Sequence, residues 1–362
     1  MPFRIIRNDI TRIKADAIVN TANPRPRIGR GTDSAVYAAA GKEKLLAARR
    51  KIGDVAPGQA VFTEAFDLSA EYVIHTVGPV WIDGEHGERE TLRACYANSL
   101  ALADRLKCKS IAFPLISSGS YGFPKDEALH IALSEIQRFL LTHEMKITIV
   151  VFDRKALELS ESLVGGIEQY IDDHAVKMLR RRERGDIEAP RCHRRVPSRR
   201  DETAAFERLV SVCEPMEEDK GATVEASVLP KTGAIPDMSG KSLDEVLGSA
   251  GESFQQRLFE LIDESGMDDV TVYKKANVDR KVFSRIRCKP DYKPKKKTAV
   301  AFAIALELDM PTMTDLLSRA GIAFSPSDTF DLIVSYFITH RNYDVFEINA
   351  ALFKYGQPIL GE

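Results

Sequence analysis

The segment Asn20–Gly41 constrains the fold of this chain more than any other part of it. An apolar, partly β-branched run at 17–19 predicts a strand that ends at Asn20. A loop containing Gly29 and Gly31 follows (the first loop, residues 20–31), and a helix is expected to open at Asp33 and to stop at Gly41. This order presents backbone N–H groups and the positive end of a helix to an anion. The segment therefore predicts a phosphate site.

A second loop of the same kind, residues 116–124, reads ISSGSYGFP. It follows the apolar run 111–115 and precedes a helical stretch that starts at Lys125. Serine hydroxyls and glycine N–H groups are donors, and glycine lets the backbone approach a ligand closely. Either loop alone is equally consistent with an ordinary strand-to-helix turn. Two such loops at strand ends of one small domain favour a diphosphate held between them.

Residues 1–173 resemble a macro domain of the MacroD type, which is the ADP-ribose-binding fold. The matching segments occur in the order of the family, and the first loop aligns without a gap. They are Asn8–Ile10 with Asp16–Asn20, residues 20–41, Tyr72–Pro79, and the second loop. The resemblance implies ADP-ribose as the ligand, with no metal and no dissociable cofactor.

The resemblance also implies roles for residues near the adenine ring. Asp9 matches an acidic residue that accepts a hydrogen bond from the adenine amino group, and Ile10 offers its backbone N–H. A turn cap is the alternative for Asp9. Phe152 ends the last predicted strand, where macro domains place an aromatic ring against adenine; core packing is an equal alternative.

Two residues of the first segment match groups beside the distal ribose. The Asn23 amide would contact the sugar, and the Asp33 carboxylate would orient or activate water near C1″. Asp33 is also a favoured residue type for capping a helix. The remaining expected ligand contacts are Asn20, Gly29, Gly31 and Thr32 in the first segment, and Ser118, Gly119, Ser120, Tyr121, Gly122 and Phe123 in the second loop.

The first segment departs from the hydrolase pattern of the family. Ile28 and Arg30 replace two of four glycines, and Tyr37 stands where histidine is usual. Fewer glycines leave less room near the distal ribose, and Arg30 adds a planar cation that would aid binding or obstruct the sugar pocket. The loop therefore predicts binding of ADP-ribose more strongly than turnover. His75 lies in an alternating strand and is expected to be a hydrogen-bonded core residue.

Alternating strand and helix patterns over 1–173 predict an α/β domain with a mostly parallel or mixed sheet covered on both faces. Its ligand crevice is expected at the carboxyl ends of the strands. Strands are expected at 2–7, 16–20, 60–66, 71–77, 110–115 and 146–152. Helices are expected at about 33–51, 88–107, 125–143 and 156–173.

Residues 174–252 are predicted to form a charged, flexible linker. Ten Lys or Arg and three Asp or Glu fall within 177–200, whereas 201–253 holds twelve Asp or Glu and four Lys or Arg. Segments of this kind bury little apolar surface. The basic half could contact nucleic acid, or it could be a solvated tether that pairs loosely with the acidic half.

Helical periodicity returns over 253–362 and predicts a small all-α domain. Residues 272–287, VYKKANVDRKVFSRIR, resemble the helix-turn-helix core of the Cro/lambda-repressor-like (XRE-type) family. Asn277 replaces the usual turn glycine, and the bulky Tyr273 replaces a small residue. The second helix, expected at 279–287, would expose Arg280, Lys281, Ser284 and Arg285, which can contact bases or phosphates. A protein-docking role is equally consistent with this helix pair, and the following lysine run, Lys293–Lys297, fits either a phosphate contact or a solvated surface.

Composition limits the classes of protein further. The apolar fraction of 44% and charged fraction of 29% are typical of a soluble globular protein, and five cysteines without metal-ligand spacing predict reduced thiols and no metal site. The N-terminus has no signal-peptide pattern, and no apolar run approaches membrane-spanning length. These features favour a cytoplasmic protein; they do not predict an oligomeric state.

Two functions follow from the sequence. The first is a hydrolase that removes ADP-ribose from an acidic side chain, or that deacetylates O-acetyl-ADP-ribose, directed by the C-terminal domain. The second is a non-catalytic ADP-ribose reader that regulates transcription or a partner. Asn23 and Asp33 favour the hydrolase, whereas Arg30 and Tyr37 favour the reader. The expected partners are ADP-ribose or an ADP-ribosylated target, and DNA or a protein through 253–362, with no membrane.

Overall fold

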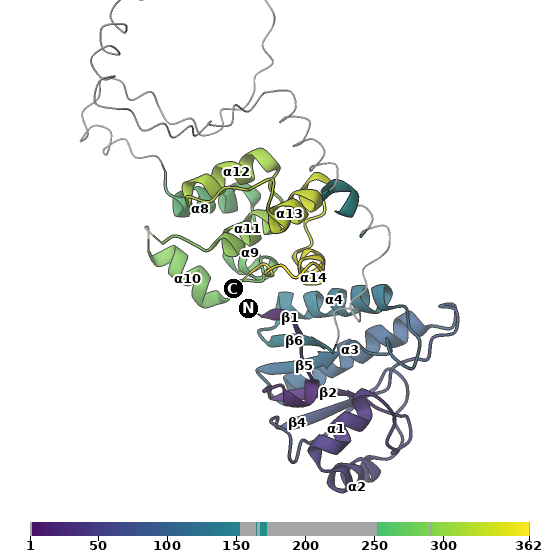
Figure 1. The fold of residues 1–362 in the computed structure, drawn as a ribbon. Coiled ribbons are helices and arrows are strands. Elements are labelled where there is room, and N and C mark those ends of the chain that lie inside the picture. Colours follow the sequence, from purple (N-terminus) through teal and green to yellow (C-terminus); the bar gives the residue numbers. More distant parts are fainter. Residues whose placement is uncertain (1, 153–163, 165–166, 172–251, 290–291, 362) are drawn as a thin grey trace, which may run out of the picture. The chain divides into compact units, whose positions relative to one another are not determined.

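The computed structural model describes residues 2–152, 164, 167–171, 252–289 and 292–361. These residues belong to one compact unit, which we divide into an α/β part (2–171) and a helical part (252–361) (Figure 1). The predicted linker and most of the predicted helix at 156–173 lie outside the described residues.

The α/β part contains a six-stranded sheet with the order β1-β6-β5-β2-β4-β3. All neighbouring strands are parallel except β3, which runs antiparallel to β4. The predicted mixed sheet is confirmed, and each predicted strand is found within two residues of its expected ends. The strands are β1 (Phe3–Arg7), β2 (Ala17–Thr21), β3 (Ala60–Glu64), β4 (Tyr72–Thr76), β5 (Ser110–Pro114) and β6 (Lys146–Val151).

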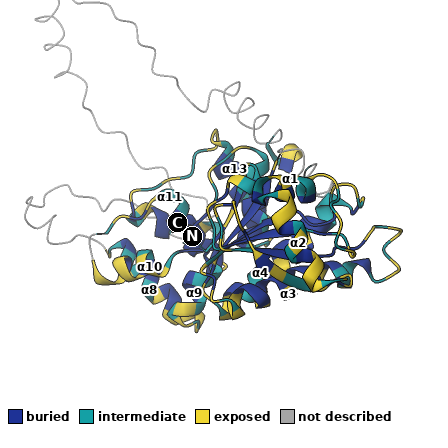
Figure 2. Ribbon diagram, turned by 90° about the horizontal axis from the view of Figure 1, so that it is seen from below, coloured by how far each residue is buried: buried dark blue, intermediate teal, exposed yellow. Residues whose placement is uncertain are grey.

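Helices cover both faces of this sheet, so the central strands are buried on both sides (Figure 2). Alternate residues of β2 enter two different apolar clusters: Val19 packs with residues of α3 and α4, and Ile18 with residues of α1 and α2. The helix expected at 33–51 is broken in two at Gly41, whose φ is 87°. The helices are η1 (Ile10–Arg12, a 3-10 turn), α1 (Thr32–Ala40), α2 (Lys42–Ile52), α3 (Glu88–Arg105) and α4 (Lys125–Thr142).

The helical part is all-α, as predicted. Five of its helices begin at an aspartate whose carboxylate accepts backbone N–H bonds of the first turn. Residues 298–305 of α11 are all buried, so α11 is the central helix of this part. The helices are α8 (Phe254–Ser265), α9 (Asp269–Lys275), α10 (Arg280–Cys288), α11 (Lys296–Ala305), α12 (Met310–Arg319), α13 (Thr329–Thr339) and α14 (Val345–Lys354).

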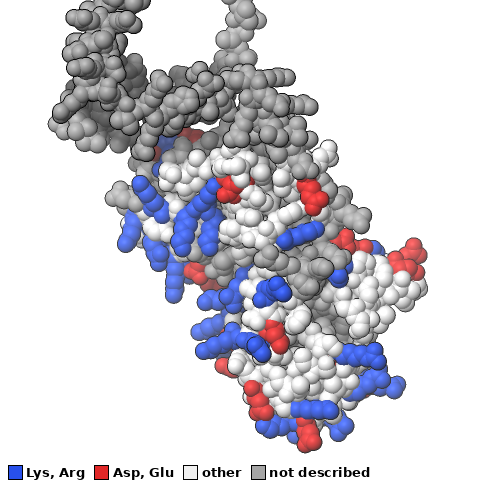
Figure 3. Space-filling model, in the orientation of Figure 1, with Lys and Arg blue, Asp and Glu red and all other residues white. Residues whose placement is uncertain are grey.

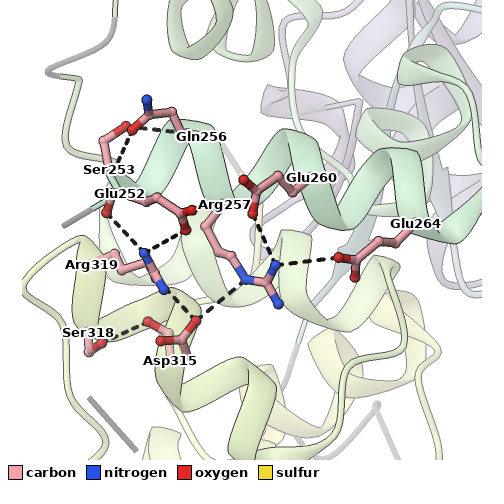
Figure 4. A network of polar contacts seen from close by, with 9 residues as sticks. All are labelled: Glu252, Ser253, Gln256, Arg257, Glu260, Glu264, Asp315, Ser318 and Arg319. Atoms are coloured by element: carbon pink, nitrogen blue, oxygen red, sulfur yellow. Dashed lines mark hydrogen bonds and ion pairs between the residues drawn. The ribbon is translucent and has the colours of Figure 1, made fainter. Parts of the chain in front are cut away.

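A charged network joins α8 to α12 (Figure 4). The Asp315 carboxylate lies 3.1 Å from Arg319 Nε and 3.5 Å from Arg257 Nε, and Arg319 also reaches Glu252 at 3.1 Å. Arg257 extends the network to Glu260 at 3.1 Å. Since the two arginine side chains are about three-quarters buried, with exposures of 23% and 25%, the network fixes how α8 packs on α12.

The helical part is joined to the α/β part by the asparagine of the α9–α10 turn. Asn277 is fully buried, and its Oδ1 accepts a hydrogen bond from Phe3 N at 2.9 Å while its Nδ2 donates to Phe3 O at 3.0 Å. Phe3 lies on β1, an edge strand, whose outward backbone groups would otherwise lack partners. The φ of Asn277 is 53°, a conformation that asparagine tolerates better than most residues.

The second departure from the helix-turn-helix pattern, Tyr273, belongs to the same junction. Its ring packs on Phe283 with centroids 5.6 Å apart, and its hydroxyl lies 3.4 Å from Glu144 Oε1 of the α/β part. The adjacent Lys274 Nζ donates to Leu141 O at 3.1 Å. Both departures are therefore explained by contacts between the two parts of the molecule.

The variant Asn277→Gly should lower the free energy of unfolding by about 2–4 kcal/mol, because Phe3 N–H and C=O would lose both buried partners. Glycine keeps the left-handed backbone, so only the side-chain bonds are removed. Glu307→Gly is the matched control, since Glu307 has a φ of 56° and an exposed side chain. Urea titration of both variants measures the difference; equal midpoints would show that Asn277 does not hold the two parts together.

Candidate ligand cleft

The carboxyl ends of β2, β5 and β6 open into a cleft of about 780 Å³, in the range of small-molecule sites. The first and second loops form its two walls. Ten of the predicted site residues line it: Asn23, Gly29, Gly31, Thr32, Asp33, Ser118, Gly119, Ser120, Tyr121 and Phe152. The cleft therefore lies where the sequence predicted the crevice.

Asp33 organises the first loop. Its Oδ2 accepts a hydrogen bond from Gly29 N at 2.5 Å, and its Oδ1 accepts one from Asn20 Nδ2 at 2.6 Å. A Cβ atom on Gly29 would lie 2.6 Å from Asn23 Nδ2 and 3.1 Å from Asp33 Oδ2, so the close approach requires glycine. Burial raises the pKa of Asp33, and the bonds from Gly29 and Asn20 oppose that rise.

The helix starts within one residue of the expected position, but the alternative that Asp33 caps it is wrong. The helix α1 begins at Thr32 with Gly31 as its N-cap, and no side chain caps it. Asp33 lies within the first turn and points back to Gly29. Each carboxylate oxygen has a second lone pair, so a residue lining the cleft in this way can still accept a proton or a hydrogen bond from a ligand or water.

A buried histidine supports Asn20 from behind. His75 and Asn20 are fully buried, with Asn20 Nδ2 3.3 Å from His75 Nδ1 and Thr63 Oγ1 3.0 Å from His75 Nε2. The Asn20 amide nitrogen donates to Asp33 and also faces His75 Nδ1. Since the amide nitrogen is a donor, His75 Nδ1 is the acceptor and carries no proton. Burial, with a smaller effect of Arg49, lowers the pKa of His75 to about 3. The prediction of a hydrogen-bonded core histidine is confirmed.

Arg49 of α2 holds the first loop in place, and no sequence motif marks this residue. Its side chain is 1% exposed and donates to Gly53 O, to Pro24 O at 3.2 Å and to Asn23 O at 3.4 Å. Tyr37, at the position where histidine is usual in the family pattern, is buried and does not line the cleft. Burial, together with the Asp33 carboxylate, raises the pKa of Tyr37 to about 12.

The second loop approaches the end of β4 closely. A Cβ atom on Gly78 would collide with Ser117 Oγ, and Ser117 itself has a φ of 62°. Ser117 Oγ is buried and has no hydrogen-bond partner among the described residues, which makes it an additional candidate for ligand contact. Two predicted contacts, Gly122 and Phe123, do not line the cleft.

Phe123 instead belongs to the core behind the second loop. Its side chain is buried, and its ring lies against Trp81 with centroids 4.6 Å apart. Gly122 supplies the positive φ of 69° at which the loop turns back toward Ser117. These two residues shape the loop and do not face the cleft.

The adenine-binding residues predicted after β1 and β6 follow two neighbouring strands, but Phe152 lines the cleft and the other two do not. Phe152 is 81% exposed and lines the cleft, so the core-packing alternative is wrong for it. Asp9 caps η1, with Oδ1 accepting from Thr11 N at 2.9 Å and from Thr11 Oγ1 at 2.8 Å. Asp9 and Ile10 follow β1 and do not line the cleft, and Asn20 lies behind Asp33.

The charge of the cleft suits an anion. Arg27, Arg30 and Lys125 line it, and Asp33 is its one lining carboxylate among the described residues. Arg30 is exposed and does not fill the cleft. Phosphate groups between the two loops would meet these cations together with the N–H groups of Gly119 and Ser120.

The predicted nucleic-acid residues lie elsewhere. Arg280, Lys281, Ser284 and Arg285 of α10 line a different groove, against the amino ends of β5 and β6. Within the lysine run, Lys296 pairs with the buried Asp331 at 2.6 Å and is a structural residue.

One cluster that the sequence did not predict could hold a metal by distance alone. Asp83 and His86 precede α3 and lie together with Glu88, its first residue. Burial opposes ionisation of the Glu88 carboxylate, but backbone N–H bonds from Ile82, Gly84 and His86 lower its pKa to about 2. The three side chains are therefore explained by hydrogen bonds that hold the loop of residues 82–86 against the start of α3.

Known proteins similar in sequence match the part of the chain that forms the cleft. The sequence profile of the macro domain family matches residues 19–132. A macro domain-containing protein of Chlorobaculum tepidum is 48% identical over 147 residues, which are 41% of this chain and 84% of that protein. The chain belongs to the macro domain family. An O-acetyl-ADP-ribose deacetylase of Escherichia fergusonii is 44% identical to this chain over 167 residues. The matched residues are 45% of this chain and 94% of that enzyme.

Among solved structures, the Oceanobacillus iheyensis macrodomain with ADP is 37% identical to this chain. The match covers 42% of this chain and 85% of that macrodomain, with a TM-score of 0.41. The family profile covers most of the residues that line the cleft. No described helix is both long and apolar enough to cross a membrane.

Proposed function

We propose that the macro domain binds ADP-ribose in the cleft and hydrolyses an ester on its distal ribose, with O-acetyl-ADP-ribose or an ADP-ribosylated acidic side chain as substrate. The observation that carries the proposal is the Asp33 carboxylate, which lies on the cleft wall and is held in place by Gly29 and Asn20. The names of the relatives from Escherichia fergusonii and Klebsiella pneumoniae, both O-acetyl-ADP-ribose deacetylases, support this reaction.

The lining residues suggest an orientation for the ligand. The exposed Phe152 ring would stack on adenine, with Asp9 and Ile10 beside it after β1. The diphosphate would lie between the two loops, on Ser118–Tyr121 and the first-loop N–H groups. The distal ribose would then reach Asn23, which the structure holds against Gly29.

Asp33 would act on water. It would accept a proton as water attacks the ester carbonyl carbon, and the C–O bond to the ribose would break as the ribose oxygen regains a proton. The products are a carboxylic acid and ADP-ribose with a free hydroxyl, so atoms and charges balance. The Asn23 amide would hold the sugar during this step.

A non-catalytic reader remains the second candidate. Arg30 and Tyr37 favour it. Arg30 is one of two residues of the first loop that replace glycines of the hydrolase pattern, and Tyr37 of α1 replaces its usual histidine. We further propose that α9 and α10 form an XRE-type helix pair that directs the macro domain to nucleic acid or to a protein.

The full chain should bind ADP-ribose more tightly than ADP or AMP, because the latter two lack the distal ribose that would meet Asn23. Phe152→Ala should weaken ADP-ribose binding about 10-fold, the scale of one stacked ring. Isothermal titration calorimetry measures both. Phe62→Ala is the control, since Phe62 is 43% exposed on β3 and does not line the cleft. A wild-type protein that gives no binding signal with ADP-ribose would refute the assignment of the cleft.

A further inference from the structure

A basic groove of about 1000 Å³ lies between the two parts of the molecule. We define it by six cations: Lys109 and Lys146 of the α/β part, and Lys274, Arg280, Lys281 and Arg285 of the helical part. Lys109 precedes β5 and Lys146 begins β6, so the groove lies at the amino ends of the strands. Lys and Arg side chains gather on the side of the molecule that carries α10 (Figure 3). The groove is therefore at the opposite ends of the strands from the cleft.

Two carboxylates, Glu144 and Asp279, line the groove itself. Asp279 caps α10 through Lys281 N at 2.9 Å, and Asp268 caps α9 through Thr271 N at 3.1 Å. Asp269 pairs with Arg287, which is not a groove residue. A capping carboxylate keeps its charge, and the six cations of the groove therefore exceed its two lining carboxylates.

The groove cations themselves remain available. Lys109, Lys146, Arg280 and Lys281 are exposed and form no ion pair with any described residue. They come from both walls, so an anion in the groove would be contacted from two sides. A compact anion would reach few of them, whereas a chain of phosphates could reach all.

Apolar side chains line the groove between these cations. Leu140, Met145, Val278 and Tyr273 form its floor, and since they are buried they offer bases only a small apolar surface. Single-stranded nucleic acid combines outward phosphates with bases that can rest on apolar and aromatic surfaces. A duplex turns its bases inward and takes a recognition helix into its major groove. Here the four candidate residues of α10 face a wall formed by the α/β part, which favours the single strand.

We propose that the basic groove binds single-stranded nucleic acid through phosphate contacts from both walls. The proposal differs from recognition by α10 alone because it requires Lys109 and Lys146, which no helix-turn-helix pattern includes. It is also independent of ADP-ribose chemistry, because no groove residue lines the cleft.

The test uses the full chain and a fluorescein-labelled, mixed-sequence DNA strand of about twelve nucleotides, within the site sizes of known single-strand binders. Fluorescence anisotropy is measured for wild type, Lys109→Ala/Lys146→Ala, Arg280→Ala/Arg285→Ala and the control Lys42→Ala/Lys51→Ala. The control removes the same charge from exposed positions on α2. Since residues 177–200 are also basic, differences between variants, and not binding by the wild type, assign the site.

Each groove variant should weaken binding about 10-fold and reduce the slope of log K against log salt by about 1.4, at about 0.7 per phosphate contact. The control should bind as wild type. To exclude misfolding, all variants should bind ADP-ribose in calorimetry as wild type does. If wild type does not bind ADP-ribose, the variants should unfold in urea at the wild-type midpoint.

Three results would overturn the proposal. Unchanged binding by Lys109→Ala/Lys146→Ala, with loss in the α10 variant, would show that α10 acts alone. Tighter binding of the matching duplex than of the single strand would assign the surface to duplex DNA. Equal binding by all four proteins would assign nucleic-acid contact to another part of the chain.

Discussion

Asp33→Ala is expected to lower the turnover number for O-acetyl-ADP-ribose by about 10²–10³-fold, the scale of removing a general base. ADP-ribose binding should weaken by no more than about 10-fold, because affinity would come mainly from adenine and diphosphate contacts. Asn23→Ala should show the same split between turnover and binding. Release of acetate, followed with calorimetry of ADP-ribose on the same samples, separates the two effects.

Asp67→Ala is the matched control, since it removes a carboxylate that is exposed and paired with Lys44 outside the cleft. Asn20→Ala should give an intermediate loss, because Asp33 would keep its bond to Gly29 but lose the one to Asn20. Equal turnover by wild type and Asp33→Ala would reject Asp33 as the base. A wild type that binds ADP-ribose but turns over neither type of ester would be the reader.

Acid is expected to destabilise this protein through His75. The pKa of His75 is lowered to about 3 in the folded state, against about 6.5 in an unfolded chain. Between these values the unfolded state binds one more proton, so the stabilisation is complete above pH 6.5 and is lost as the pH falls. The slope for one proton is about 1.4 kcal/mol per pH unit. Because the unfolded histidine is already half protonated at pH 6.5, lowering the pH from 6.5 to 4.5 should cost about 2 kcal/mol through this residue.

The measurement is urea unfolding of wild type and His75→Gln across that pH range. The variant should be less stable at pH 7, because it loses the fit to Asn20 and Thr63, but its stability should fall less steeply with acid. His130→Gln is the control, as His130 is exposed on α4. Parallel slopes for wild type and His75→Gln would show that His75 is not the residue responsible. Asp33 acts in the opposite direction, since its raised pKa lets the folded state take up a proton in acid.

The sequence predicted the elements of the cleft because their signals are local. The strand before Asn20, the stop at Gly41 and the serine–glycine loop each follow from a few neighbouring residues. The direction of the Asp33 side chain did not, because capping and binding Gly29 N compete for the same oxygens. Only the path of the backbone between Gly29 and Asp33 decides between them.

The partners of the supporting residues could not be predicted, because they are distant in sequence. His75 lies 55 residues from Asn20, and Arg49 lies 26 residues from Asn23. Arg49 belongs to no motif, whereas His75 lies in the matched segment Tyr72–Pro79 and was predicted as a hydrogen-bonded core residue without its partners. Asn277 and Tyr273 read as departures from a helix-turn-helix pattern because their partners, Phe3 and Glu144, lie on another part of the fold.

The contact between Asn277 and Phe3 also bears on self-association. The strand β1 is one of the two edges of the sheet, and an open edge can accept a strand from another molecule. Asn277 occupies the outward N–H and C=O of Phe3, and the Phe3 ring packs on Phe346 of α14, with centroids 4.8 Å apart. A shortened chain without the helical part would present both an unpaired strand edge and an uncovered aromatic ring. The helical part therefore covers the edge of the sheet at Phe3, a position where a second molecule could otherwise pair.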